Sequence, residues 1–211
     1  MLGFPSSTEI RKVITKKKVF EHFGAAMSPE RRRSFDADIA RIVLVNEVSP
    51  ASVNIAAGQE VQAFFVVQIT LRKPDYDRQN IVFIAKMFGQ KLLLVIEYEE
   101  MRQLALWQTR LIIRNEGFAI RDYELPAIEL NGMDLDRVWE NIVAGIAGVA
   151  VAPGRTLDEQ LALQQKREKL QKEIARLEKL AWSEKQPKRK MELAQQKRKL
   201  EEEYNGLELG S

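Results

Sequence analysis

The strongest pattern along the chain is the two-residue alternation of hydrophobic and polar positions that is typical of β-strands. It is clearest over residues 61–71, where the centre of the segment is apolar on both faces, so we expect a strand inside a sheet. Runs rich in β-branched and aliphatic residues predict further strands at 39–48 and 92–98, and residues 101–113 should form the hairpin partner of the latter. Residues 118–123 are expected to add a last short strand. The pattern predicts a mixed sheet of about four to five strands.

Two helix-start signals precede the first of these strands. Ser6 and Glu9 have the spacing of a capping box, which predicts a helix that begins near Ser7. Ser28 stands directly before Pro29, a pair that is typical of an N-cap followed by the first helical residue. The N-terminal segment is therefore expected to be helical.

Two further segments repeat their hydrophobic residues with the period of an α-helix. Residues 76–88 lie between two predicted strands, and residues 134–149 follow the last strand. Each carries one apolar face, so we expect both helices to pack on the sheet. The predicted fold is an α+β body over residues 1–154 with flanking helices.

The remaining residues, 155–211, differ in kind and form a predicted tail. Helices are expected at about 157–182 and 184–205, and a break near Pro187 leaves two alternatives, a helical hairpin or one kinked helix. Apolar residues recur at the spacing of a coiled-coil seam. We expect this coiled coil to set the oligomeric state or to bridge subunits. The seam consists of Leu163, Leu170, Ile174, Leu177, Ala181, Leu193, Leu200 and Tyr204.

Composition narrows the chemistry. The chain of 211 residues has no cysteine and a single histidine, which excludes disulfide scaffolds, thiol catalysis, cysteine-ligated zinc and multi-histidine metal sites. Phosphate-binding glycine loops and the serine-hydrolase elbow are also absent from the sequence. The sequence contains neither a signal peptide nor a span long enough for a bilayer, so we expect a cytoplasmic protein without cofactor and without membrane contact.

A metal-dependent nuclease is the enzyme class that deserves a test. The predicted order of strand, helix and strand over residues 61–98 matches part of the layout of PD-(D/E)xK nucleases, in which carboxylates of the first strand hold Mg²⁺ and a lysine orients water. The corresponding stretch here, Gln68 to Thr70, contains neither a carboxylate nor a lysine. Glu60 and Asp75 lie at the wrong places, so the sequence favours a protein that is not an enzyme.

Charge is unevenly distributed. The chain has 33 basic and 30 acidic residues, and its net charge of +3 equals that of the tail alone. Within the body, residues 1–41 carry a net positive charge and residues 42–154 carry a net negative charge. Basic side chains gather at the N-terminus and near the bend of the tail, where they could contact nucleic-acid phosphates or pair with acidic residues of the coiled coil. The candidate nucleic-acid contacts are Lys16, Lys17, Lys18, Arg31, Arg32, Arg33, Lys188, Arg189, Lys190, Lys197 and Arg198.

Several segments resemble a known bacterial family. Residues 1–9, 49–55, 65–71, 133–141 and 170–179 are similar to the family catalogued as domain of unknown function four-three-nine-one. The resemblance covers nearly the whole chain. It implies genes placed beside DNA methyltransferases and helicases in restriction-like or anti-phage islands, and it implies no catalytic residue.

The leading hypothesis is a non-enzymatic accessory or assembly subunit of such a system. It would dock on a helicase or methyltransferase and form a homo-oligomer or a hetero-complex through its tail. Two alternatives remain open: a divergent metal-dependent nuclease, and a DNA-binding module that uses the basic N-terminus and the tail bend.

Overall fold

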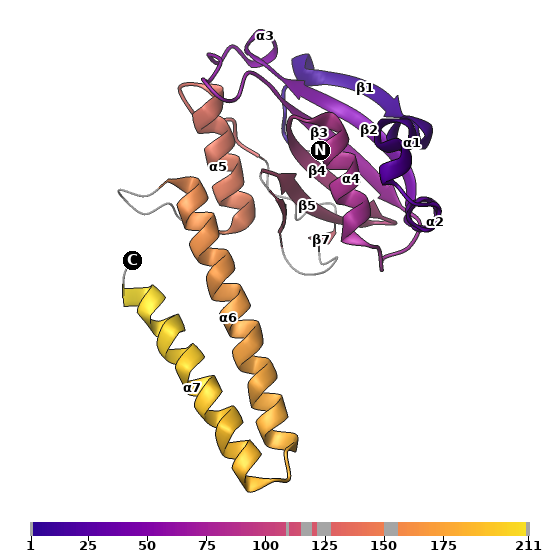
Figure 1. Cartoon of the computed structure of the whole chain (residues 1–211). Coiled ribbons are helices and arrows are strands. Elements are labelled where there is room, and N and C mark those ends of the chain that lie inside the picture. Colours follow the sequence, from indigo (N-terminus) through magenta and orange to yellow (C-terminus); the bar gives the residue numbers. More distant parts are fainter. Residues whose placement is uncertain (1, 109, 115–119, 122–127, 150–155, 210–211) are drawn as a thin grey trace. The chain divides into compact units, whose positions relative to one another are not determined.

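The computed structural model describes residues 2–108, 110–114, 120–121, 128–149 and 156–209 (Figure 1). The chain divides into two compact units, Met1–Gly148 and Val149–Ser211. The first unit is an α+β body built on a mixed sheet, and the second contains the two long helices of the tail.

Six strands of the body lie side by side in the order of the sequence, and a seventh, β7 (Ile120–Arg121), also pairs with β5. Strands β3 and β4 are parallel and are connected by helix α4 (Arg78–Phe88), whereas the other paired strands of the described residues run antiparallel. In the strand order, this parallel pair lies at the centre of the sheet. The strands are β1 (Glu9–Ile14), β2 (Ile39–Val48), β3 (Phe64–Leu71), β4 (Lys91–Tyr98), β5 (Met101–Trp107) and β6 (Leu111–Ile113).

The predicted strand count was too low. The segment 101–113 contains two strands, β5 and β6, because the chain turns at Gln108–Arg110 and pairs back on itself. The expected strand at 118–123 corresponds in part to β7, and its remaining residues lie outside the described ones.

The predicted helix near Ser7 was wrong. Ser6–Thr8 form one 3-10 turn, and the chain then continues as strand β1. Pairing explains the outcome: β1 adds to the edge of the sheet along β2, and Ile14 is buried opposite Ile42. Such long-range pairing outweighs a local capping signal. Helix α1 (Lys16–Phe23) begins only after Thr15, whose side chain accepts a hydrogen bond from the Lys18 N–H.

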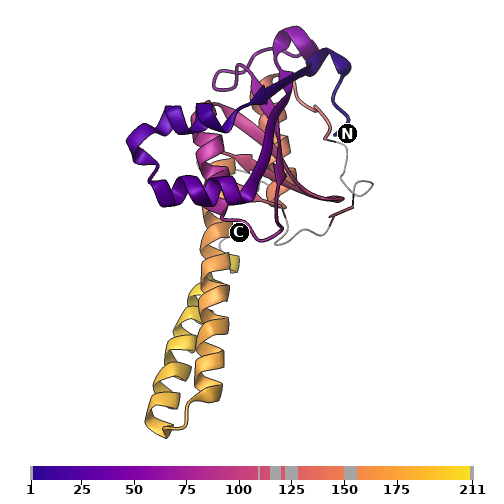
Figure 2. The same ribbon diagram turned by 90° about the vertical axis from the view of Figure 1, so that its right-hand side faces the viewer.

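One face of the sheet carries the main core of the body. Helices α1, α2 (Pro29–Asp38) and α4 cover this face (Figures 1 and 2). Ser28 caps α2, as predicted, by accepting a hydrogen bond from the Arg31 N–H. Fully buried side chains from all three helices meet those of the central strands, among them Val19, Phe35, Ile81, Ile84, Val67, Ile69, Leu94 and Ile96.

A buried polar cluster joins α2 to α4. The carboxylate of Asp38, at 2% exposure, accepts hydrogen bonds of 2.8 Å from the Asp77 N–H and from Nδ2 of Asn80, and Lys73 lies 2.9 Å away. Burial alone would raise the pKa of Asp38, but the hydrogen bonds from Asp77, Lys73 and Asn80 hold it below its ordinary value. The cluster therefore fixes the start of α4 through the paired carboxylate of Asp38.

Helix α5 (Leu135–Ala147) packs on the opposite face of the sheet, toward β5 and β6. Trp139 is buried there against Phe64, with ring centroids 5.2 Å apart. Asp136, in the first turn of α5, accepts hydrogen bonds from the N–H groups of Gln59, Glu60 and Val61. This contact anchors the segment between α3 (Pro50–Val53) and β3 to the start of α5.

The tail folds as a helical hairpin. Helices α6 (Leu157–Ser183) and α7 (Pro187–Leu209) lie side by side (Figures 1 and 2). Lys197 of α7 contacts Glu178 of α6 at 2.8 Å, and Gln171 donates to the hydroxyl of Tyr204 at 2.7 Å. Of the two alternatives that the sequence left open, the structure has the hairpin and not the kinked helix.

Candidate functional site

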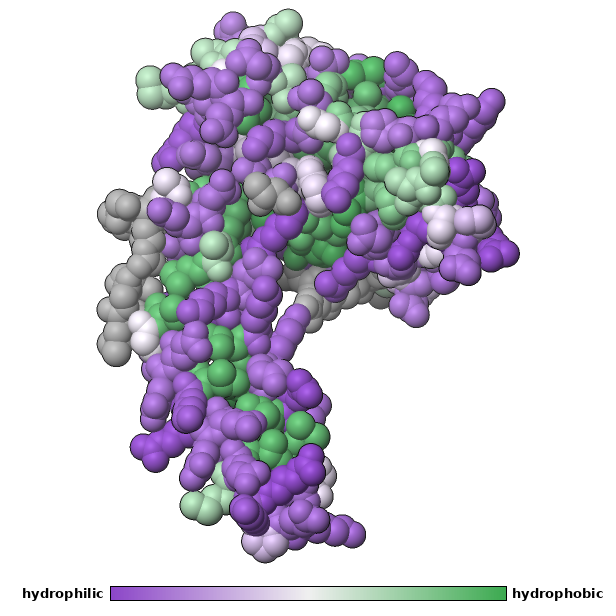
Figure 3. Space-filling view, viewed as in Figure 1, coloured by the Kyte–Doolittle hydropathy of each residue, from purple (hydrophilic) through white to green (hydrophobic). Residues whose placement is uncertain are grey.

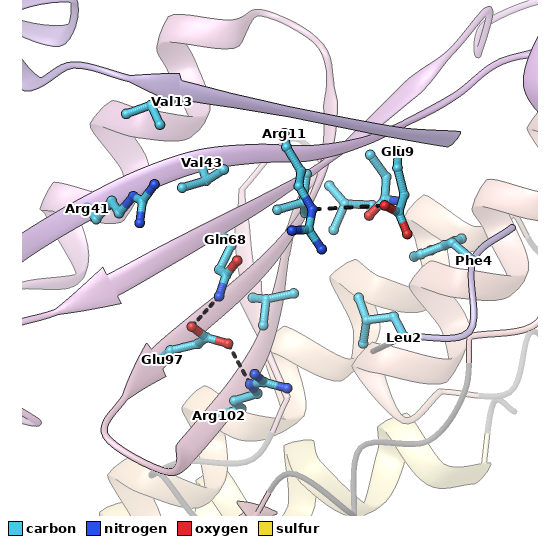
Figure 4. Close-up of a pocket in the computed structure, with 14 residues that line it drawn as sticks. Leu2, Phe4, Glu9, Arg11, Val13, Arg41, Val43, Gln68, Glu97 and Arg102 are labelled. Carbon is cyan, nitrogen blue, oxygen red and sulfur yellow. Dashed lines mark hydrogen bonds and ion pairs between the residues drawn. The ribbon is translucent and has the colours of Figure 1, made fainter. Parts of the chain in front are cut away.

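A groove lies on the face of the sheet opposite the main core (Figure 4). Its cavity volume is about 350 Å³, which falls at the low end of the range of small-molecule sites. Strands β1 to β5 and the N-terminal segment contribute its walls. Its polar lining residues are Glu9, Arg11, Arg41, Asn46, Gln68, Glu97 and Arg102, and its apolar ones are Leu2, Phe4, Val13, Val43, Val45, Val66 and Val95.

The strand register brings the polar residues together. Arg41 pairs with Thr70, Thr70 with Glu97, and Glu97 with Arg102, so these residues form one row across β2, β3, β4 and β5. Three strand spacings of ~4.8 Å place the two arginines of the row about 14 Å apart, with Thr70 and Glu97 between them. The row explains how residues distant in sequence reach one site.

Irregular pairing shapes the rim. Between Glu9 and Lys12, β1 carries one residue more than β2, and Arg11 within this bulge has a positive φ of 52°. A bulge shifts the alternation of side chains by one position. Arg11 lines the groove together with Glu9 and Val13. A similar shift on β2 between Leu44 and Asn46 gives that strand an extra residue beside the groove.

The centre of the groove is a hydrogen-bonded triplet from three adjacent strands. Nε2 of Gln68 donates to Oε2 of Glu97, and Nε of Arg102 lies 2.5 Å from Oε1 of the same carboxylate. Both charged side chains are largely buried, at 12% exposure for Glu97 and 25% for Arg102. The carboxylate is therefore neutralised locally, and it holds the arginine in place.

The groove does not have the donors of a nuclease metal site. Gln68 lines it at the position where a carboxylate would be needed, Thr70 occupies the position of the lysine, and neither Glu60 nor Asp75 lines it. Among the described residues, no three His, Cys, Asp or Glu side chains are grouped so as to hold a metal ion.

The basic residues predicted near the N-terminus occupy different environments. Arg31 forms an ion pair with Asp77, and Arg32 donates to the carbonyl groups of Met27 and Gly24, which fixes the turn before α2. Lys16 contacts Asp36 at 3.0 Å and Lys17 contacts Glu21 at 3.6 Å, whereas Lys18 and Arg33 are exposed. None of these six residues lines the groove.

The predicted seam residues lie at the interface of the hairpin or beside it. Leu177 is buried, and the seven others are half-buried. Figure 3 shows hydrophobic surface along the tail, bordered by hydrophilic side chains. The seam is therefore used, at least in part, for pairing within one chain.

The tip of the hairpin exposes apolar residues that the seam pattern did not single out. Trp182 is 83% exposed, Met191 64% and Leu180 43%. The sequence predicts instead that Trp182 packs at the corner of the bend against Pro187, and its exposure contradicts this. In the sequence, the exposure of Trp182 is indicated only by its position outside the spacing of the seam residues.

Basic side chains surround the exposed tip. Arg189 lies 3.5 Å from Glu184, and the side chains of Lys188 and Lys190 are exposed. Farther along α7, Lys197 contacts Glu178 and Glu201, and Arg198 contacts Glu202. Lys197 and Arg198 are thus paired with acidic residues along the hairpin, whereas the side chains of Lys188 and Lys190 at its tip are exposed.

The described part of the chain contains no helix with the length and apolar character required to cross a membrane. The described residues form an α+β body with an arginine-lined groove, and a helical hairpin. The family model described as Domain of unknown function (DUF4391) matches residues 2–203, and the chain belongs to this family. No curated protein and no solved structure matches the chain.

Proposed function

We propose that the chain is a non-enzymatic accessory subunit of a bacterial restriction-like or anti-phage system. In this proposal it docks on a helicase or a methyltransferase through the tip of its coiled-coil hairpin. The observation that carries the proposal is the exposure of Trp182, a large amphipathic side chain at the turn end of the helical pair. The family resemblance supplies the class of partner.

The energetics of the tip support docking. Burial of apolar surface drives association, and exposed tryptophans are enriched among the residues that dominate binding energy. Trp182 and Met191 offer such surface without unfolding the hairpin, because Leu177 and the seam already hold it closed. Basic side chains around them favour a partner surface that is acidic at its rim.

Pairing of α6 with α7 within one chain also changes the expected role of the coiled coil. The seam that could join two copies is occupied by its own partner helix, through contacts such as Lys166 with Glu203 at 2.8 Å. We therefore favour bridging over self-association. Light scattering tests this point: the mass of one chain, 24.3 kDa, is expected for the isolated protein.

Co-expression with the helicase and the methyltransferase encoded beside the gene tests the proposal. One of the two should co-elute with the chain, and Trp182→Ala combined with Met191→Glu should abolish co-elution. Met133→Glu is the matched control, because Met133 is 92% exposed on the body. Co-elution that survives the tip variant would refute the tip as the docking site, and failure to co-elute with either enzyme would refute the accessory role.

The nuclease remains a second candidate because the connection from β3 through α4 to parallel β4 has the layout that such enzymes use. The only carboxylates that line the groove in the described residues are Glu9 and Glu97. Cleavage of plasmid DNA with Mg²⁺ or Mn²⁺ that is lost in Glu97→Gln would favour this candidate. Cleavage that persists in this variant would point to a contaminating enzyme.

A further inference from the structure

We propose that the groove on the sheet binds a nucleoside phosphate, with the phosphate on the arginines and the base on the valine floor. The nucleotide could be free or could be one unit of a single-stranded nucleic acid. This inference does not depend on the docking role of the hairpin, because it concerns a different surface of the chain.

Three guanidinium groups supply the phosphate site. Arg11, Arg41 and Arg102 project from β1, β2 and β5 around the same hollow (Figure 4). Guanidinium groups present a planar fork of N–H donors that matches two phosphate oxygens, and they keep their charge at any physiological pH. Such convergence on one face of a sheet is not required for stability, since arginine is readily solvated elsewhere.

The arginines differ in how firmly they are held. No described acidic side chain forms an ion pair with Arg41, which is exposed at the rim. Arg11 lies 3.9 Å from Glu9, and both side chains are well exposed, so this pair is weak and readily exchanged for a phosphate. The carboxylate of Glu97 holds the guanidinium group of Arg102 in place. The site therefore combines one positioned guanidinium with two that can close on a ligand.

The floor between these arginines is aliphatic. Val43, Val45, Val66 and Val95 lie side by side on β2, β3 and β4, and Phe4 adds an aromatic ring at the edge. A flat, apolar ring buries well on such a surface, while its phosphate remains at the rim. Gln68 at the centre supplies an amide beside the floor, which suits the polar edge of a base.

Size and composition together favour a nucleotide over other anions. A volume of about 350 Å³ accepts one compact ring with its phosphate, whereas a duplex is too wide to enter. A simple inorganic anion would leave the valine floor unused, and an acidic peptide would present carboxylates without a flat ring. A nucleotide uses the arginines and the floor at once.

Fluorescence anisotropy with a labelled oligothymidylate at low salt tests the inference on the full chain. Binding is expected, and Arg41→Gln should weaken it by about tenfold or more, the loss that follows from one charge-assisted contact. Arg78→Gln is the matched control, because it removes the same charge from an exposed position of α4 outside the groove. It should change the affinity by less than about twofold, beyond which long-range charge alone explains the effect.

Competition distinguishes the two sources of the nucleotide. Displacement of the oligothymidylate by thymidine monophosphate at comparable concentration indicates a site for free nucleotides, and displacement by unlabelled single strand alone indicates a strand site. Val13→Glu, at the half-exposed rim, should weaken either form by adding a carboxylate. Absence of binding, equal loss in Arg41→Gln and Arg78→Gln, stronger binding of a duplex, or equal displacement by polyglutamate would each overturn the proposal.

Discussion

Gln68 on β3 donates a hydrogen bond to the carboxylate of Glu97 on its parallel neighbour β4, and the same carboxylate contacts Arg102 on β5. A metal-dependent nuclease would place a carboxylate at the position of Gln68 and would leave it free to bind a cation. Here an amide occupies the position, and the nearby carboxylate is already neutralised by an arginine. At this contact the carboxylate of Glu97 is paired with both an amide and a guanidinium group.

Gln68→Glu tests how closely this triplet is balanced. Two carboxylates at a half-buried contact repel each other, so we predict a loss of about 1–2 kcal/mol in the free energy of unfolding at neutral pH. Urea denaturation measures it. Gln90→Glu, in the exposed turn before β4, is the control and should have little effect. An equally stable Gln68→Glu variant would show that the hydrogen bond contributes nothing.

Asp38 should carry a pH-dependent part of the stability. Because its pKa in the folded state is lowered from 3.8, its contribution is complete above this value and is lost as the pH falls through the lower, folded-state pKa. Asp38→Asn should cost about 2–4 kcal/mol at neutral pH, since it leaves Lys73 and the Asp77 N–H without their charged acceptor. The stability of the Asp38→Asn variant should also depend less on pH below about pH 4 than that of the unchanged protein.

The control for Asp38 is Asp36→Asn, which removes an exposed carboxylate that contacts Lys16. Exposed ion pairs contribute little, so this variant should lose less than about 1 kcal/mol. Comparable losses in the two variants would contradict the role of the buried cluster.

Gly58 and Gly145 should respond in opposite directions to replacement by alanine. A Cβ at Gly58 would overlap the carboxylate of Asp136, whose hydrogen bonds to three N–H groups would be displaced, so Gly58→Ala should cost about 2 kcal/mol or more. A Cβ at Gly145, inside α5, meets nothing within 4 Å. Gly145→Ala should therefore stabilise the protein by about 0.5–1 kcal/mol through helix propensity. Thermal unfolding of both variants decides the prediction, and two changes of the same sign would contradict it.

Closure of the hairpin within one chain can be tested by cross-linking. The sequence has no cysteine, so the pair Glu178→Cys and Lys197→Cys provides two defined thiols at positions whose native side chains are 2.8 Å apart. A short bis-maleimide should link them within a single chain, which mass spectrometry and gel mobility will show at monomer mass. Each single-cysteine variant is a control that can link only between chains. Predominant dimers from the double variant would mean that the tail pairs between copies.

Much of the fold could be predicted from local patterns. The strand at residues 39–48, the crossover helix after Asp77 and its end at Gly89 follow from β-branched runs, capping and a left-handed glycine, all of which act within a few residues. The first strand could not be predicted in this way. Its capping-box spacing was outweighed by pairing with β2, a partner some 30 residues distant in the sequence.

The candidate site shows the same division. Arg31 and Arg32 stood out in the sequence as clustered charges, yet in the structure Arg31 pairs with Asp77 at the start of α4 and Arg32 holds the turn before α2. Arg11, Arg41 and Arg102 are distant from one another in the sequence and line one groove only because strands β1 to β5 lie side by side. Charge clustering along the chain does not reveal which side chains share a face.

The sequence by itself determined that a mixed α+β body is followed by two amphipathic tail helices, because these patterns are periodic and local. It also excluded thiol chemistry and multi-histidine metal sites, because the chain has no cysteine and a single histidine. Only the tertiary structure decided that the tail closes as a hairpin and that Gln68 lies against Glu97. Both depend on which distant segments pair and in which register, and a bulge such as that between Leu44 and Asn46 of β2 changes which side chains share a face of the sheet.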